Sequence, residues 1–156
     1  MASLLGKPHA NTPSYNPSQK GYWTNGDYQL YKYYATNMTG HRVGTTVSSD
    51  LKLDTYSTVG TDGVVRVLAG VRITMGTWYV TVTNLTAVGL PAAGTLNIHT
   101  WGFPVAADVH YGEVDGPNDL GSVAYTYTGN AVTLPVYQKD NTTAYAFEFA
   151  AGSVAA

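Results

Sequence analysis

Aromatic side chains are the residues of this sequence best suited to hold a ligand. The 156 residues include 13 Tyr and 3 Trp, more than the core of a chain this long needs. A flat ring stacks on the C–H face of a sugar, while neighbouring Asn, Asp and Gln side chains bond its hydroxyl groups. We interpret four aromatic residues as candidate carbohydrate-binding residues, with burial in the core as the alternative: Tyr22, Trp23, Trp101 and Tyr111.

A second group of chemically active residues lies in the Gly- and Pro-rich segment 110–119. It contains Glu113, Asp115 and Asp119 together with Asn118. Oxygen ligands gathered in one loop can hold Ca²⁺, although this spacing does not fit an EF-hand. The segment is therefore either a structural calcium site or a solvated loop, because acidic residues are ordinary in loops. An enzyme that acts through Glu113 is the least favoured alternative.

No signature of a hydrolytic or phosphoryl-transfer reaction is present. The sequence has no G-x-S-x-G, no Gly-rich phosphate loop and no Cys, and its four His share no metal-ligand spacing. Glu148 stands between Phe147 and Phe149, and this alternation predicts that its side chain lies on the solvent face of a strand. We expect a protein without catalytic activity, and without a cofactor other than a structural calcium ion.

Charge excludes two classes of partner. The chain has 8 Lys and Arg against 10 Asp and Glu, a formal net charge of -2, and its basic residues are scattered singly. Nucleic acids and anionic membranes select basic stripes, so neither is an expected partner. No apolar run has the length of a transmembrane helix, which is about 18 residues or more.

Three N-glycosylation sequons favour secretion weakly, since a Thr-rich chain also contains such triplets by chance. They begin at Asn37, Asn84 and Asn141. The first residues do not have a basic segment followed by a long apolar stretch, so they do not predict a signal peptide. A secreted protein would therefore be represented here by its mature part.

One helix is predicted near the start of the chain, after an irregular lead-in over residues 1–26. Asn25 is a suitable N-cap for a helix over 27–40, and Gly40 is suitable for ending it in a left-handed conformation. An apolar stripe is expected to pack on the rest of the domain, with Gln29 on the opposite face. The stripe consists of Leu30, Tyr31, Tyr34, Ala35 and Met38.

Residues 42–150 are predicted to be all-β, followed by a tail over 151–156. Short runs rich in Val, Thr and Tyr alternate with turn residues, which indicates an antiparallel β-sandwich of jelly-roll-like or immunoglobulin-like connectivity. Trp78 is expected in its core. Nine strands are predicted, over 42–47, 51–58, 64–74, 77–84, 94–101, 105–111, 122–128, 131–137 and 143–150, with turns at 60–63, 75–76 and 128–130.

Several segments resemble the C-terminal part of clan A glycoside hydrolases of the family 39 type. They are the Tyr-rich helix ending in Met38-Thr-Gly40, preceded by Gly21-Tyr-Trp23, and the strand segments 53–56, 65–70, 76–85 and 94–98. In that family a (β/α)8 barrel ends in such a helix, and a β-sandwich follows and packs against the barrel. The resemblance places 27–40 on the last barrel helix. The barrel with its two catalytic glutamates is absent, so no catalytic residue is carried over.

The resemblance implies a non-catalytic ancillary domain of a secreted polysaccharide-degrading glycoside hydrolase. Such a domain would bind plant or microbial cell-wall polysaccharide, or brace a (β/α)8 catalytic barrel. The alternative is a structural subunit of an extracellular fibre or surface assembly. Low charge and Val- and Thr-rich strands would suit strand addition to a neighbouring molecule in that case.

Overall fold

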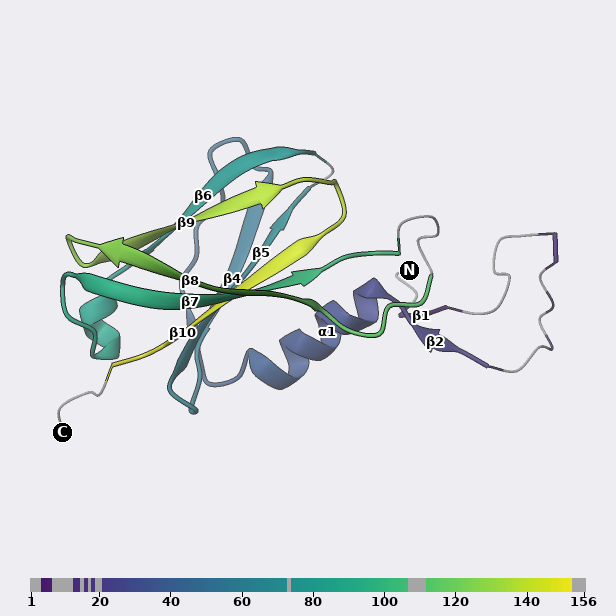
Figure 1. Cartoon of the computed structure of the whole chain (residues 1–156), viewed down its shortest axis with the longest axis horizontal. Coiled ribbons are helices and arrows are strands. Elements are labelled where there is room, and N and C mark those ends of the chain that lie inside the picture. Colours follow the sequence, from purple (N-terminus) through teal and green to yellow (C-terminus); the bar gives the residue numbers. More distant parts are fainter. Residues whose placement is uncertain are drawn as a thin grey trace.

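A computed structural model of the chain describes residues 4–6, 13–14, 16, 18, 21–72, 74–106 and 112–152. Within them lie one α-helix, one 3-10 helix and ten strands (Figure 1). Their bounds are β1 Leu5–Gly6, β2 Trp23–Thr24, α1 Gly26–Asn37, β3 His41–Val43, β4 Leu53–Val59, β5 Val64–Val71, β6 Gly76–Thr83, η1 Leu85–Val88, β7 Gly94–Phe103, β8 Asn118–Tyr127, β9 Ala131–Gln138 and β10 Ala144–Ala150.

The strands confirm the predicted all-β, sandwich-like fold. A six-stranded antiparallel sheet has the order β3-β4-β5-β10-β7-β8, and a two-stranded sheet, β6-β9, faces part of it (Figure 1). Eight of the predicted strands correspond to β3–β10. The strand predicted over 105–111 is not found at 105–106, and residues 107–111 lie outside the described part. The pair β1–β2 falls in the segment that was predicted to be irregular.

The main core lies between the two sheets and follows the alternation of the strands. Val132, Leu134 and Val136 of β9 are almost completely buried and meet Phe147 and Phe149 of β10. Trp78 packs against this core, as predicted, and its indole nitrogen donates a hydrogen bond to Asp50. Full burial of one such aliphatic or aromatic side chain stabilises the fold by about 1.5–3 kcal/mol.

Local sequence signals set the start of α1 and the turn between β8 and β9 as predicted, whereas the helix ends at Asn37, three residues before the predicted end. The Asn25 side chain accepts a hydrogen bond from the amide of Tyr28 at 2.9 Å, which caps the first turn of the helix. Gly40 has a φ of +87°, and a Cβ at this position would lie 2.2 Å from the Val59 carbonyl oxygen. Gly129 and Asn130 both have positive φ in the tight turn between β8 and β9.

Helix α1 covers the face of the six-stranded sheet opposite to β6–β9, but the prediction of its buried stripe is partly wrong. Leu30 and Met38 do pack against the sheet, whereas Tyr31 and Tyr34 are 55% and 46% exposed. Gln29, predicted on the outer face, is only 6% exposed. The helix is rotated because the sheet presents charged groups as well as apolar ones on this face.

We expect Leu134→Ala to lower the free energy of unfolding by about 2–5 kcal/mol, since a fully buried leucine leaves a cavity when it is truncated. Leu120→Ala is the matched control. Leu120 is exposed, so this change should alter the free energy by no more than about 0.5 kcal/mol. Urea denaturation followed by circular dichroism measures both variants. Equal losses would contradict the assignment of the core.

Candidate functional site

A small pocket lies between α1 and the sheet face that the helix covers. Its volume is about 220 Å³, below the range of about 300–1,000 Å³ that is usual for sites of drug-sized ligands. We call it the Trp101 pocket. Helix α1, strands β7 and β10 and the segment before β8 contribute its lining, which consists of Gln29, Lys32, Tyr33, Thr36, Asn37, Trp101, Pro117 and Glu148.

Glu148 lies in this pocket and not on a solvent face, so the prediction for it is wrong. Phe147 and Phe149 point into the sandwich core, as their alternation requires, and Glu148 therefore points to the other side of β10. That side is covered by α1. The Tyr33 hydroxyl donates a hydrogen bond to Glu148 Oε1 at 2.6 Å, and Arg66 Nε donates to the same oxygen at 3.2 Å.

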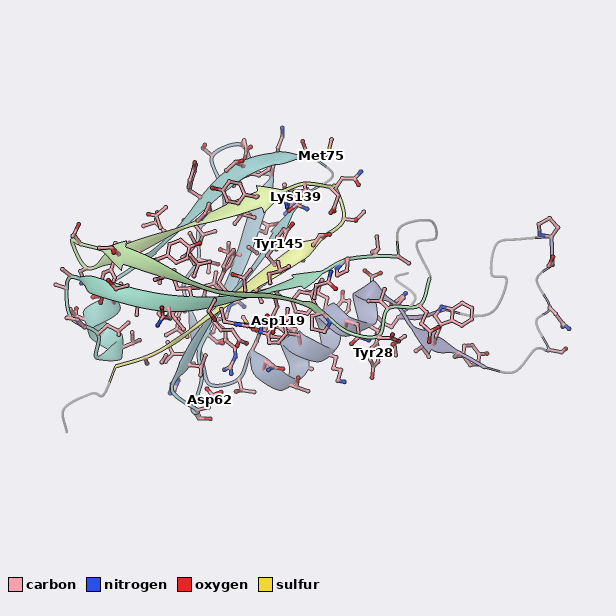
Figure 2. All side chains as sticks on the ribbon, viewed as in Figure 1. Tyr28, Asp62, Met75, Asp119, Lys139 and Tyr145 are labelled. Atoms are coloured by element: carbon pink, nitrogen blue, oxygen red, sulfur yellow. The ribbon has the colours of Figure 1, made fainter. Side chains whose placement is uncertain are left out.

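The Arg66 guanidinium joins two carboxylates beneath the helix. Arg66 stands directly opposite Glu148 in the register of β5 and β10, and its side chain is only 8% exposed. Its two terminal nitrogens donate to the two oxygens of Asp62, at 3.1 and 2.6 Å. Figure 2 shows Asp62 at the tip of the β4–β5 hairpin. A bidentate contact of this kind fixes the orientation of the guanidinium plane.

These contacts hold Tyr33, Asp62 and Arg66 each in one protonation state. Burial raises the pKa of the Tyr33 hydroxyl far above its ordinary value, and the hydrogen bond to Glu148 and the negative charge there raise it further. The hydrogen bonds from Arg66 lower the pKa of Asp62, and the same contact raises the pKa of Arg66. Tyr33 therefore remains a hydrogen-bond donor, while Arg66 and Asp62 remain charged at neutral pH.

Trp101 is half-buried, and a histidine holds its ring in place. The rings of Trp101 and His99 meet nearly edge to face, with centroids 4.6 Å apart. His99 Nδ1 lies 3.0 Å from Ser122 Oγ. Its Nε2 lies 3.2 Å from Asp119 Oδ1, but without hydrogen-bond geometry. These contacts restrict the imidazole and therefore fix the aromatic wall of the pocket.

Gln29 ties the pocket to the strand before the helix. Its Nε2 donates to Thr24 Oγ1 at 3.0 Å and to the Val114 carbonyl oxygen at 2.7 Å, and the Val114 amide donates to the Thr24 carbonyl oxygen at 2.9 Å. On the next turns of α1, Lys32 is exposed, and Thr36 Oγ1 donates to Asn37 Oδ1 at 2.6 Å. The rim of the pocket is thus polar.

Of the predicted carbohydrate-binding residues, only Trp101 lines this pocket. Tyr22 is exposed and Trp23 is half-buried in β2, and neither belongs to the pocket lining. Tyr111 lies outside the described residues. The predicted set is therefore not brought together into one site.

The structure does not bring the three predicted metal ligands together. Among the described residues, no group of three or more His, Asp or Glu side chains could hold a metal ion. Glu113, Asp115 and Asp119 are all exposed, and Asp119 accepts a hydrogen bond from the Gly121 amide at 2.8 Å. The calcium site therefore stays a prediction, with the solvated loop as its alternative.

The exposure of the sequon asparagines and the length of the helices bear on the predictions about glycosylation and about a transmembrane helix. Of the three sequon asparagines, Asn84 and Asn141 are exposed and Asn37 is half-buried, and glycosylation itself stays a prediction. None of the helices in the described part of the chain is long and apolar enough to cross a membrane.

Sequence reasoning missed an exposed aromatic group on the same side of the sheet. The rings of Tyr34 and Tyr56 meet edge to face with centroids 6.2 Å apart, and the Arg42 guanidinium carbon lies 5.5 Å from the centroid of Tyr56. The alternation along β4, whose Leu53 lies in the main core, could have placed Tyr56 on the helix-covered face. The sequence predicts Tyr34 on the packed stripe of the helix, but the residue it meets depends on where the helix lies on the sheet, and local patterns do not give this position.

Comparison with known proteins shows where this fold occurs. No protein-family model matches the sequence, and no curated protein matches it. The structure of N2152 from Neocallimastix frontalis is similar, with a TM-score of 0.67 and 16% identity over 83% of this chain and 31% of that chain. A family 44 endoglucanase produced by Clostridium acetobutylium gives a TM-score of 0.51 and 14% identity over 80% of this chain and 22% of that chain.

A third neighbour is a Paenibacillus polymyxa xyloglucanase of family 44, solved with xyloglucan. Its TM-score is 0.51 and its identity 15%, over 81% of this chain and 23% of that chain. This chain has the same fold as one part of each of these two glycoside hydrolase chains. At these identities the likeness concerns the fold alone, and this chain spans less than a third of each neighbour. Both glycoside hydrolases named here belong to family 44, so the resemblance to family 39 stays a prediction.

We expect Tyr33→Phe to lower the free energy of unfolding by about 1–3 kcal/mol, because a hydrogen bond to a charged acceptor is lost. Tyr34→Phe is the matched control, since the described residues make no hydrogen bond to its exposed hydroxyl. Urea denaturation at neutral pH compares the two variants. A loss in the Tyr34 variant as large as in the Tyr33 variant would show that the bond to Glu148 contributes little.

Asp62→Asn should lower the free energy of unfolding at pH 7. In acid the difference between this variant and the unchanged protein should disappear. The pKa of Asp62 is lower in the folded than in the unfolded chain, so its charged form stabilises the fold above the ordinary aspartate pKa of about 4. That stabilisation disappears as the pH falls through the folded-state pKa. Denaturant midpoints measured between about pH 7 and pH 2 test this. Asp115→Asn is the control, and a pH-independent effect of Asp62→Asn would contradict the prediction.

Proposed function

We propose that this chain is a non-catalytic β-sandwich domain of a secreted glycoside hydrolase, and that it binds polysaccharide by holding one sugar residue in the Trp101 pocket. The observation that carries the proposal is the arrangement of Trp101 and Glu148 in one small pocket. An aromatic wall for a C–H face and an oriented hydrogen-bond acceptor are the two elements that sugar recognition requires.

Glu148 can accept a hydrogen bond from a ligand with the carboxylate oxygen that the described residues leave unbonded. Both of its bonds, from Tyr33 and from Arg66, reach Oε1. The second oxygen, Oε2, accepts no hydrogen bond from the described residues. A hydroxyl group in the pocket can donate to Oε2, and the Arg66 charge beside it reduces the cost of burying the carboxylate.

The same pocket supports binding in preference to hydrolysis. Glycoside hydrolysis uses two carboxyl groups on either side of the scissile bond, about 5–9.5 Å apart. Glu148 is the single carboxylate among the described lining residues, and its Oε1 is occupied by Tyr33 and Arg66. We therefore assign the pocket a binding role.

The comparisons support the wider setting of the proposal. Two neighbours are named as an endoglucanase and a xyloglucanase of family 44, and this chain matches less than a quarter of each of them. A domain of such an enzyme would act outside the cell beside a catalytic domain, and a (β/α)8 barrel of the family 39 type is the candidate for that domain. The ligand class is a plant or microbial cell-wall polysaccharide, with xyloglucan as the first one to test.

The test is retention of the purified chain on a panel of polysaccharides. The panel contains xyloglucan, xylan, arabinan, galactan, β-glucan, chitin and cellulose. We expect retention on one class, and Trp101→Ala should weaken the affinity for it by at least about tenfold. Glu148→Gln should also weaken it, because the amide has a single acceptor oxygen where the carboxylate offers Oε1 to Tyr33 and Arg66 and Oε2 to the ligand.

Two controls separate the pocket from other aromatic surfaces. Tyr22→Ala removes an exposed predicted stacking residue, and Tyr137→Ala removes an exposed tyrosine of β9. Both variants should bind like the unchanged protein. Retention that depends on Tyr22 and not on Trp101 would move the site to β2. No retention on any polysaccharide would overturn the binding role and favour a structural one.

A further inference from the structure

The two layers of the sandwich are unequal, and among the described residues the smaller one has an open edge on β6 and another on β9, which carries Pro135. The first sheet has six strands and the second only β6 and β9. In the described part of the chain, β6 pairs with β9 on one side and with no strand on the other. Figure 1 shows β6 on the outer side of β9. The backbone groups on the free side of β6 are therefore available to another strand.

A deep groove runs along this open edge. Its volume is about 800 Å³, and it lies between β6 on one rim and residues 43–48 on the other, over strands β3, β4 and β5. Its apolar lining includes Val43, Val47, Val59, Val80 and Val82. The backbone of residues 44–47 makes no hydrogen bond to another described residue. Both rims of the groove thus present unpaired backbone beside apolar side chains.

The composition of β6 leaves this edge unprotected. Natural edge strands carry charged residues or proline, are very short, or contain bulges, because an open edge invites pairing with another chain. Strand β6 has eight residues, Gly76–Thr83, with neither a charged residue nor proline. At the edges of the six-stranded sheet, by contrast, β3 has three residues and includes Arg42, and β8 carries Asp119 and a positive-φ Gly121.

We propose that the groove is a docking slot for one extended segment of another polypeptide. The segment would pair its backbone with the free edge of β6 and place alternate apolar side chains over the valines of the groove. The lining contains no Asp, Glu, Lys or Arg. A charged segment would lose its hydration there without gaining a partner, so the complementary occupant is uncharged, with apolar residues at every second position.

A second copy of this chain fits the groove less well. Pairing of β6 with β6 of another copy would place a two-fold axis beside the free edge. Residues of β3 and β4 and the rim at 43–48 line the groove beside that edge. A second copy would have to fit around this rim in both directions, whereas a single segment of a different polypeptide needs only the one open edge.

The probe is a labelled peptide, acetyl-K-T-V-T-V-T-V-K-amide, whose six central residues have the stated chemistry and whose terminal lysines only keep it in solution. It is titrated into the full chain and followed by fluorescence anisotropy. Two further peptides carry N-methyl groups on all threonines or on all valines, which removes the backbone donors of one strand edge. We expect binding of the first peptide, slower hydrogen exchange over residues 76–83, and at least tenfold weaker binding of one methylated peptide. No binding at about 1 mM, or equal binding of all three, would overturn the proposal.

Matched variants locate the binding. Val47→Asp introduces a charge at a groove residue that is 54% exposed, and Val123→Asp does the same on β8 at a residue that is 55% exposed. The first should abolish binding and the second should not. Trp101→Ala should leave peptide binding unchanged, which separates this proposal from the glycan site. A dimer of the chain alone that Val47→Asp converts to monomer would show that a second copy fills the groove, and the proposal would be wrong.

Discussion

The buried Arg66 guanidinium is the interaction on which the arrangement of this domain depends. It lies on the sheet face that the sandwich core does not use, and a cation there requires negative partners. Asp62 supplies one from the β4–β5 hairpin and Glu148 supplies the other from β10. Glu148 in turn receives the Tyr33 hydroxyl from α1. One side chain thus links a turn, two central strands and the helix.

This linkage explains why the helix presents an unexpected face to the sheet. A helix that covered the sheet with its most apolar stripe would bring Tyr31 and Tyr34 inward and leave Glu148 with one partner fewer. The observed rotation brings Tyr33 and Gln29 inward instead, and both make hydrogen bonds to other elements. The polar requirement of the sheet face therefore decides the rotation, and the Trp101 pocket is the space left beside these contacts.

Sequence reasoning predicted what depends on neighbouring residues and failed where distant segments meet. The strands, the N-cap at Asn25 and the turn at Gly129 and Asn130 follow from local alternation and backbone preferences. The surroundings of Glu148 do not, because alternation says which side of β10 it occupies but not that a helix 115 residues away covers that side. For the same reason, Trp101 could be selected as an aromatic candidate while the residues around it could not.

The position of β10 has a consequence for the order in which this domain is assembled. Strand β10, residues 144–150, lies between β5 and β7 in the larger sheet, so it joins a half containing β3, β4 and β5 to a half containing β7 and β8. As the chain is synthesised, the earlier half exposes the unpaired edge of β5 until β10 has been made. Pairings between segments so far apart in sequence form slowly. Incomplete chains that lack β10 are therefore the species most exposed to aggregation.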